Sequence, residues 1–364
     1  MMGKPIKIAV IPGDGIGKEV MAEALKVLSQ LQQRDSSLQI VTTVFPWSSD
    51  YYMQHGCMMP QDALATLKGY DAILFGAIGD VRVPDDVTVW ELIMPIRKQF
   101  QQYVNFRPVK ALPGIASPLA NGKDIDFVIF RENAEGEYSN SGGRIYHNQP
   151  QEMTIQNTIM TRIGIEKIVQ AACDYAHKYG KSKITSATKS NAIIHSMKFW
   201  DEHTQNILAQ TSPALTLESI YIDALVAYFV ERPQDFEVVV ASNLFGDILS
   251  DLGSAIVGGL GLSPSANLNP EKEYPSMFEP VHGSAPDIAG KGIANPIAQI
   301  WSLALLLGHI GRPDAEDLIV SAIETVLTEG IVKTADIGGQ ASTVQMGDAI
   351  CQEIANMKLV ARGV

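Results

Sequence analysis

Residues 6–20 read IKIAVIPGDGIGKEV, an apolar run followed by a glycine loop and the start of a helical pattern. The run Ile6–Ile11 predicts a buried strand, and the pattern from Lys18 to about Leu31 predicts a helix. This order is typical of dinucleotide-binding folds, but here the glycines are spaced G-x-G-x-G rather than G-x-G-x-x-G. The next strand, which ends at Phe45-Pro46, also lacks an acid for a ribose hydroxyl. We therefore interpret the loop as a tight turn with close backbone approach, and we predict that the fold is not a Rossmann fold.

Strand-like and helix-like segments alternate beyond this stretch. Further strand-like runs lie at Leu38–Phe45, Asp71–Phe75, Phe127–Phe130, Lys183–Ala187, Leu217–Ile222 and Phe236–Ala241. This alternation predicts an α/β fold with parallel strands over much of the sheet. The C-terminal hundred residues read as helices at Ala294–Ile310, Asp314–Thr328 and Thr343–Met357. Residues 138–157 are polar, contain Gly142-Gly143 and then alternate, so they predict either a protruding arm or an ordinary surface hairpin.

The composition narrows the class of protein. The 364 residues are 46% hydrophobic, which is enough for a large core, and the net charge of −12 comes without a basic stripe. We therefore expect no nucleic-acid binding. The longest apolar run is too short to span a membrane, so we expect no membrane association. The three cysteines are widely separated and form no CxxC pair, which favours a reducing compartment and predicts a cytoplasmic protein.

Two aspartates follow the apolar strand Phe236–Ala241. Asp247 and Asp251 are four residues apart, so both project from the same helix face, where like charges repel each other. A divalent cation bound by oxygen ligands, Mg²⁺ or Mn²⁺, would explain the pair, and a solvated acidic face is the alternative. Asp223 lies in the apolar stretch YIDALV, where an acid needs a partner, and a metal would serve.

Arginines supply the opposite charge. Arg107 stands beside Pro108, Arg131 follows an apolar strand directly, and Arg97 lies in a third segment, MPIRK. Their planar guanidinium groups can hold carboxylates in bidentate fashion, although each alone is more often a surface residue. Tyr138 and Lys189 are candidate proton-transfer groups, with a packed tyrosine and a solvated lysine as the alternatives.

Together these segments resemble the metal-dependent β-decarboxylating dehydrogenases, which act on isocitrate, isopropylmalate, tartrate or D-malate. The resemblance spans nearly the whole chain. It is carried by IPGDGIGKEV at 11–20, RPV at 107–109, RENAEGEYS at 131–139, TKSN at 188–191, NLFGDILSDLG at 243–253 and EPVHGSAPDIAGKGIANP at 279–296. It implies an isopropylmalate-dehydrogenase-like two-domain fold, with a large mixed sheet flanked by helices.

The resemblance also implies roles for single residues. Arg97, Arg107 and Arg131 would bind the substrate carboxylates. Asp247 and Asp251, with Asp223 from a neighbouring subunit, would bind Mg²⁺ or Mn²⁺, and a monovalent cation is a further candidate. Lys189, also from the neighbour, would help to take the hydroxyl proton, and Tyr138 would protonate the enolate that the metal stabilises after decarboxylation. A homodimer with shared active sites would then be the smallest active unit.

The cofactor residues implied by the resemblance lie near the C-terminal part of the chain: His282, Gly283, Ser284, Ala285, Asp287, Ile288 and Asn295. Asp287 resembles the family residue that holds the ribose hydroxyls, where NADP-dependent relatives carry a Lys–Tyr pair. A carboxylate there would repel the additional phosphate, so we predict NAD. A helix N-cap before Ile288 is a compatible reading of Asp287, and Asn295 would contact the adenine side.

The segment before Arg97 is expected to choose the substrate. Trp90, together with residues 47–52 and 264–270, resembles the tartrate/D-malate branch, whereas Ile93 and Met94 could replace the leucines of isopropylmalate enzymes. Trp90 could also be core packing. Ala134, where that branch usually carries Thr, is a departure that bears on specificity.

We therefore predict NAD-dependent oxidative decarboxylation of D-malate or tartrate to a pyruvate-type product and CO₂. A 3-isopropylmalate or isocitrate dehydrogenase is the alternative, and a non-catalytic regulatory subunit of the family is a remote one. The resemblance further implies a discontinuous cofactor-binding domain at 1–102 and 258–364. Residues 103–257 would form a substrate and dimerisation domain with an arm at about 138–157.

Overall fold

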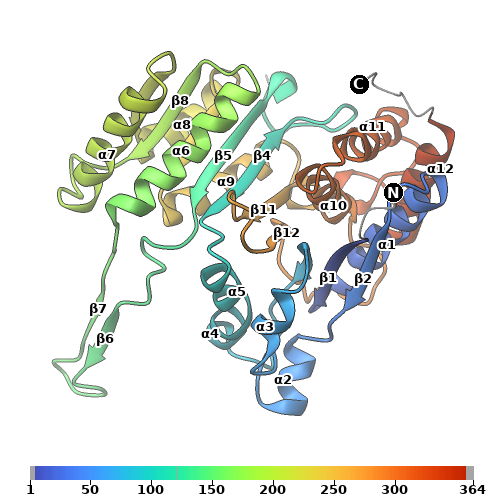
Figure 1. Ribbon diagram of the computed structural model, residues 1–364, viewed down its shortest axis with the longest axis horizontal. Coiled ribbons are helices and arrows are strands. Elements are labelled where there is room, and N and C mark those ends of the chain that lie inside the picture. The colour runs from blue at the N-terminus through green and yellow to red at the C-terminus, as the bar shows by residue number, and fades with distance from the viewer. Residues whose placement is uncertain (1–4, 121, 358–364) are drawn as a thin grey trace. The chain divides into compact units, whose positions relative to one another are not determined.

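The computed structural model describes residues 5–120 and 122–357 (Figure 1). The chain forms two compact units. Unit 1 comprises Met1–Phe100, Ala111–Lys123 and Ser254–Val364, and unit 2 comprises Gln101–Lys110 and Asp124–Gly253. The sequence-based division differs from these units mainly at residues 111–123, which belong to unit 1. Hydrogen bonds explain the assignment, because Lys333 donates to the Gly114 carbonyl at 2.7 Å and Ser117 donates to the Ile256 carbonyl at 2.6 Å.

The strands of unit 1 lie in the order β2-β1-β3-β12-β11. The first four are parallel to their neighbours, and β11 is antiparallel to β12. Their bounds are β1 Ile6–Gly13, β2 Ile40–Val44, β3 Ala72–Ala77, β11 Pro264–Leu268 and β12 Ser276–Pro280. Every residue of β3 is buried, as expected of a parallel strand that is covered on both faces.

Helices accompany these strands. They are α1 Gly17–Arg34, α2 Ser49–His55, α3 Ala63–Leu67, α4 Asp85–Thr88, α5 Met94–Gln99, α10 Ile297–His309, α11 Pro313–Glu329 and α12 Thr343–Asn356, with short turns at Leu260–Leu262 and Ala335–Ile337. In α10 ten of thirteen residues are buried, because the helix contacts α1, α11, β11 and β12. Figure 1 shows α10 enclosed by these elements. A helix that is apolar on nearly every side is stable only in such a position.

The glycine loop after β1 is a tight turn, as predicted. Gly13 and Gly15 have φ angles of 71° and 53°, in the left-handed region that favours glycine. A Cβ atom on Gly13 would lie 1.9 Å from the Ala77 carbonyl oxygen at the end of β3. Glycine is therefore required at Gly13, because the backbone there approaches the end of β3 more closely than a side chain would allow.

The strands of unit 2 lie in the order β4-β5-β10-β8-β9. All are parallel to their neighbours except β4, which is antiparallel to β5. Their bounds are β4 Val104–Lys110, β5 Asp126–Glu132, β8 Lys183–Thr188, β9 Thr216–Tyr221 and β10 Val238–Ala241. The helices are α6 Arg162–Lys178, α7 Ser196–Thr211, α8 Ile222–Glu231 and α9 Asn243–Ile256, with short turns at Gly122–Asp124 and Pro233–Asp235. The predicted α/β class with largely parallel strands is thereby confirmed.

Two glycines let α9 lie directly on the sheet of unit 2. A Cβ atom on Gly246 would meet Cγ of Arg131 at 2.5 Å, and one on Gly253 would meet Cγ2 of Val109 at 2.6 Å. Seven residues separate these glycines, which is about two helical turns, so both lie on the same helix face. That face sets the distance between α9 and the arginines of β4 and β5.

A hairpin projects from unit 2 within the predicted segment 138–157. Its strands, β6 Gly142–Ile145 and β7 Met153–Gln156, pair only with each other, and all eight residues are exposed. In Figure 1 the hairpin extends well away from α6 and the sheet of unit 2. The arm alternative is therefore the one that the structure favours. Among the described residues, no helix is long and apolar enough to cross a membrane.

Replacing Gly114 by alanine should test how residues 111–123 are held in unit 1. Gly114 has a φ angle of 75°, and its Cβ atom would lie 1.9 Å from the Leu327 carbonyl oxygen. We expect G114A to lower the free energy of unfolding by more than about 2 kcal/mol, measured by urea denaturation. Gly311 is the matched control, since its φ angle is 91° and nothing lies within 4 Å of its Cβ position. Equal losses in G114A and G311A would contradict this account.

Candidate active site

Two antiparallel strands and one helix place the central charged residues. Asn105 on β4 is paired with Arg131 on β5, and Arg107 follows two residues later on the same face of β4. Helix α9 carries Asp247 and Asp251 one turn apart, as the sequence predicts. Each strand thus contributes one guanidinium group opposite a helix with two carboxylates.

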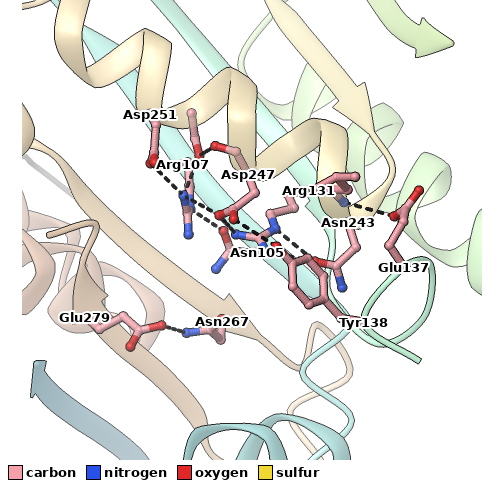
Figure 2. A network of polar contacts seen from close by, with 12 residues as sticks. Asn105, Arg107, Arg131, Glu137, Tyr138, Asn243, Asp247, Asp251, Asn267 and Glu279 are labelled. Carbon is pink, nitrogen blue, oxygen red and sulfur yellow. Dashed lines mark hydrogen bonds and ion pairs between the residues drawn. The ribbon is translucent and has the colours of Figure 1, made fainter. Parts of the chain in front are cut away.

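The two arginines are held by different contacts (Figure 2). Arg131 donates to Oδ1 of Asn243 from Nε at 3.1 Å and from Nη2 at 2.9 Å, and its Nη1 pairs with Asp247. Arg107 donates from Nε to Asn105 at 2.6 Å and bonds Ser250 through Nη1. The same Nη1 lies 3.5 Å from Asp247 and 3.7 Å from Asp251. Asp247 is therefore shared by both guanidinium groups.

Burial separates the positive from the negative members of this cluster. The side chains of Arg107 and Arg131 are 9% and 5% exposed, whereas those of Asp247 and Asp251 are 36% and 63% exposed. Buried cations need partners of opposite charge, and α9 supplies them. The accessible carboxylate oxygens fit a hard cation that completes its shell with water and other oxygen ligands. Within residues 5–120 and 122–357, no group of three His, Cys, Asp or Glu gathers around one point.

Tyr138 joins the cluster from the loop after β5. Its hydroxyl donates to Oδ2 of Asp247 at 3.2 Å, and its ring lies 5.7 Å from the Arg131 guanidinium. Burial raises the pKa of Tyr138, and the charge of Asp247 raises it further. The phenol therefore keeps its proton at neutral pH and can act as an acid.

Two glutamates that the sequence analysis did not single out shape the loop carrying Tyr138. Glu132, only 4% exposed, accepts backbone N–H bonds from Ala134 at 2.7 Å and from Glu135 at 3.0 Å. Glu137 accepts the backbone N–H of Leu244, near the start of α9, at 3.2 Å. An acid at a helix N-terminus is stabilised by the unpaired N–H groups there. The sequence signal was the run of acids in RENAEGEYS, which gave no indication of which acids turn inward.

Lys189 and Asp223 form a separate pair in unit 2. Lys189 follows β8 directly, Asp223 lies in the first turn of α8, and Lys189 Nζ is 2.6 Å from Oδ1 of Asp223. The sequence analysis expected Asp223 to need a partner, and Lys189 is that partner in this structure; the Asp223 side chain is 68% exposed although its neighbours are apolar. The apolar neighbours face the other side of α8, where Leu225 and Phe229 are buried. Lys189 lowers the pKa of Asp223.

Arg97 has its own carboxylate partner within unit 1. Its Nη2 donates to Oε1 of Glu279 at 2.7 Å. Asn267 donates to the same oxygen at 2.7 Å, and Figure 2 shows this second contact. Glu279 is only 7% exposed, and a buried carboxylate needs a nearby positive charge, which the guanidinium group of Arg97 supplies. The sequence analysis did not anticipate Glu279 or Asn267 as partners of this arginine.

The segment expected to choose the substrate contains an irregular turn. Residues Val89–Ile93 form a π-helical turn between α4 and α5, a feature that is frequent at functional sites. Trp90 is half-buried, and the ammonium group of Lys98 lies 4.8 Å from its ring centre. Ile93 is 8% exposed and belongs to the core formed with β1 and β3.

The predicted cofactor residues lie in a loop after β12 and just before α10. Residues 286–290 form a turn and not a helix, so the reading of Asp287 as a helix N-cap is wrong. The backbone explains this, since Ala285 has a φ angle of 41° and its carbonyl accepts from Ile288 and Ala289. Asp287 is exposed, whereas Asn295 is buried and donates to Asp336 at 3.0 Å.

His282 offers an unsatisfied polar atom in the same loop. Its Nδ1 lies 2.9 Å from the Gly283 carbonyl, whereas its Nε2 is buried without a hydrogen-bond partner in the part of the chain that the structure describes. Burial lowers the pKa of His282, which keeps the ring neutral. A buried ring nitrogen without a partner is unfavourable unless a ligand or water satisfies it. The loop thus fits a bound molecule that offers a hydrogen-bonding group.

Residues 7–350 match the model of the family described as isocitrate/isopropylmalate dehydrogenase. The chain therefore belongs to the isocitrate/isopropylmalate dehydrogenase family, and the predicted fold and family resemblance are confirmed. A solved relative, isocitrate dehydrogenase from Methylococcus capsulatus, is 32% identical, with a TM-score of 0.87 over 96% of this chain and 99% of that one.

Several curated relatives are more similar in sequence. A tartrate dehydrogenase/decarboxylase from Pseudomonas putida is 50% identical, covering 98% of this chain and all of that protein. A probable tartrate dehydrogenase/decarboxylase from Bacillus subtilis is 49% identical over 98% and 100% of the two chains. A decarboxylating D-malate dehydrogenase from Escherichia coli is 48% identical over 97% and 99%. The chain thus belongs to a family of decarboxylating dehydrogenases that act on hydroxy acids.

The buried Glu132 should make stability depend on pH. Burial raises its pKa from an ordinary 4.5 to about 7, so the folded state favours the protonated carboxyl. The contribution of the protonated Glu132 carboxyl to the free energy of unfolding is therefore fully present below about pH 4.5, and it is lost as the pH rises through 7. We expect the wild type to lose about 2–3 kcal/mol relative to E132Q between pH 5 and 7.5, measured by urea denaturation at each pH. A stability difference that stays constant across this range would contradict the assignment.

Proposed function

We propose that this protein catalyses the NAD-dependent oxidative decarboxylation of a small 2-hydroxy dicarboxylate, D-malate or tartrate, with Mg²⁺ or Mn²⁺. The observation that carries the proposal is the cluster of Arg107, Arg131, Tyr138, Asp247 and Asp251. It combines anion recognition, a cation site and an acid within one unit. The names of the most similar relatives, which refer to tartrate and D-malate, support this choice of substrate.

Arg107 and Arg131 would bind a substrate carboxylate. The chain carries a net charge of −12, so an anionic substrate needs local cations to overcome long-range repulsion. Both guanidinium groups are fixed by Asn105, Ser250 and Asn243, and rigid donors lose little entropy when a ligand binds. Arg97, held by Glu279, is proposed as a third carboxylate ligand.

Asp247 and Asp251 would hold the divalent cation. When bound, such an ion supplies Lewis acidity that draws electron density from the oxygen of the substrate. The side chains of Asp247 and Asp251 are 36% and 63% exposed, so an ion from solvent can reach both carboxylates. Asp223 is proposed as a further ligand that comes from a partner subunit, because it is exposed and lies in the first turn of α8.

Tyr138 and Lys189 would move the protons. The Tyr138 phenol is protonated at neutral pH and is oriented by Asp247, so it can deliver a proton to carbon after CO₂ leaves. Lys189, as a neutral amine, would take the hydroxyl proton in the site of the partner subunit, and Asp223, 2.6 Å from its Nζ, would hold the lysine side chain in place. This division of labour requires a homodimer, for which the exposed apolar residues of the arm, such as Ile145, Met153 and Ile155, are suitable.

NAD would bind at the loop 282–288 and Asn295. When bound, NAD accepts the hydride from the hydroxyl-bearing carbon. The exposed carboxylate of Asp287 would accept hydrogen bonds from ribose hydroxyls and would repel the phosphate of NADP. The three cysteines are all free thiols, in keeping with the proposed location in the reducing cytoplasm.

Formation of NADH by the purified protein tests the reaction and the substrate together. We expect the fastest turnover with D-malate or a tartrate isomer, slower turnover with 3-isopropylmalate and isocitrate, and complete loss of activity with a chelator. Preference for 3-isopropylmalate would keep the reaction type and remove the role of Trp90 in substrate choice. Inactivity on all four acids, with NAD and with NADP, would favour a regulatory subunit.

Replacing Tyr138 by phenylalanine tests the proposed proton donor. We expect Y138F to lower kcat about 100-fold or more, because general acid catalysis contributes factors of this size. The substrate dissociation constant, measured by calorimetry with Mn²⁺ present, should change less than threefold. Y228F is the matched control, since Tyr228 lies on α8 outside the cluster and its ring stacks with the guanidinium group of Arg232. A Y138F enzyme with wild-type kcat would exclude this role.

A further inference from the structure

The glycine loop at residues 12–17 has so far no role in the proposed reaction. In a Rossmann fold, the backbone N–H groups of such a loop bind phosphate. Here those groups already have partners, because Asp14 N–H donates to Ala77, Ile16 N–H to Ser284 and Gly17 N–H to Asp14, each at 2.9 Å. The loop therefore cannot offer these N–H groups to a phosphate. The Ile16 N–H group instead donates to Ser284, which lies in the predicted cofactor loop, residues 282–292.

Gly15 and Ile16 form the contact with that loop. A Cβ atom on Gly15 would lie 2.0 Å from the Ser284 carbonyl oxygen and 2.9 Å from Ser284 Cβ. Ile16, only 4% exposed, packs with Val20 and Ala294 in a small core that the cofactor-loop residues Ala285 and Ile288 also contact. Backbone bonding and apolar packing thus hold residues 284–288 against the start of α1.

Glu19 holds the far end of the same loop. Its carboxylate accepts the backbone N–H groups of Gly290 and of Gly292, the latter at 3.0 Å. Both glycines have positive φ angles, 76° and 64°, so this end of the loop has little stiffness of its own. A carboxylate that accepts two backbone N–H bonds is a strong restraint on a glycine-rich segment.

Asp14 fixes the glycine loop itself. Its side chain is 2% exposed and accepts three hydrogen bonds: from Ser49 N–H at 2.8 Å, from Ser49 Oγ at 2.7 Å and from Gly79 N–H at 3.0 Å. These bonds join the loop after β1 to the start of α2 and to the segment after β3. These hydrogen bonds therefore hold the glycine loop 12–17, which contacts the cofactor loop, in a fixed conformation.

We propose that Asp14, Gly15 and Glu19 are positioning residues for the cofactor, which hold the loop 282–292 in its binding conformation before NAD arrives. This inference rests on the proposed function, because it takes the loop 282–288 as the NAD site. The glycine loop acts on NAD indirectly, through the backbone of Ser284 and Gly290, and not as a phosphate cradle.

Binding of NADH, followed by its fluorescence without substrate, tests the proposal on the full-length protein. We expect G15A and E19A each to raise the dissociation constant of NADH about tenfold, since a loop that must order on binding costs affinity. E19Q, which keeps one acceptor oxygen, should recover part of the loss. G56A is the control, because Gly56 has a φ angle of 73° with nothing within 4 Å of its Cβ position.

Hydrogen exchange separates positioning from a merely structural role. We expect amides 284–292 of E19A to exchange faster than those of the wild type without NADH, and turnover at saturating NAD to stay within threefold. E19A lies at the surface end of the contact, so it keeps the test informative even if G15A fails to fold. An E19A protein with wild-type NADH affinity and loop protection would overturn the proposal.

The variant D287A distinguishes a failure of this proposal from a failure of the proposed function. Loss of NADH affinity in D287A, with G15A and E19A unchanged, would overturn the positioning role while the NAD site stands. A wild type that binds neither NADH nor NADPH would instead overturn the proposed function.

Discussion

Two buried guanidinium groups, on Arg107 and Arg131, require negative charge within reach, and much of unit 2 is arranged to provide it. Helix α9 supplies Asp247 and Asp251, and it lies close enough only because Gly246 and Gly253 leave room for β5 and β4. The same carboxylates keep exposed oxygens for a cation. The same charges thus stabilise the fold and form the candidate site. Leaving either buried arginine without a partner would lower the free energy of unfolding by several kcal/mol.

Carboxylates, two of them buried (Asp14 and Glu279) and one partly exposed (Glu19), organise unit 1 in a comparable way. Asp14, Glu19 and Glu279 each accept hydrogen bonds from a loop or a side chain that the proposed reaction needs. Together with Glu132 in unit 2, they show that the acidic residues of this chain are not only surface charge. The net charge of −12 therefore hides a division between solvated acids and acids that act as internal hydrogen-bond acceptors.

The sequence predicts the elements and the main site residues, because both are recorded in local patterns. The run Ile6–Ile11, the pair Asp247 and Asp251, and the spacing of the glycine loop are all legible without coordinates. The hydrogen-bond partners are not legible, since Asn243 and Glu279 meet their arginines only through pairing of distant segments. The partner of Asp223 is not legible either, since Lys189 follows β8 and meets Asp223 only because β8 pairs with β9.

The face of α9 that touches the sheet has a consequence for how this protein can drift during evolution. Alanine is one nucleotide change away from glycine, and alanine is the better helix former. At Gly246 and Gly253, however, the added methyl group would push the helix away from Arg131 and Val109. A change that favours the isolated helix would thus weaken the site, so selection on this segment acts against helix propensity. Neutral variation is accordingly expected to collect on the opposite face, where Ile248 is half exposed.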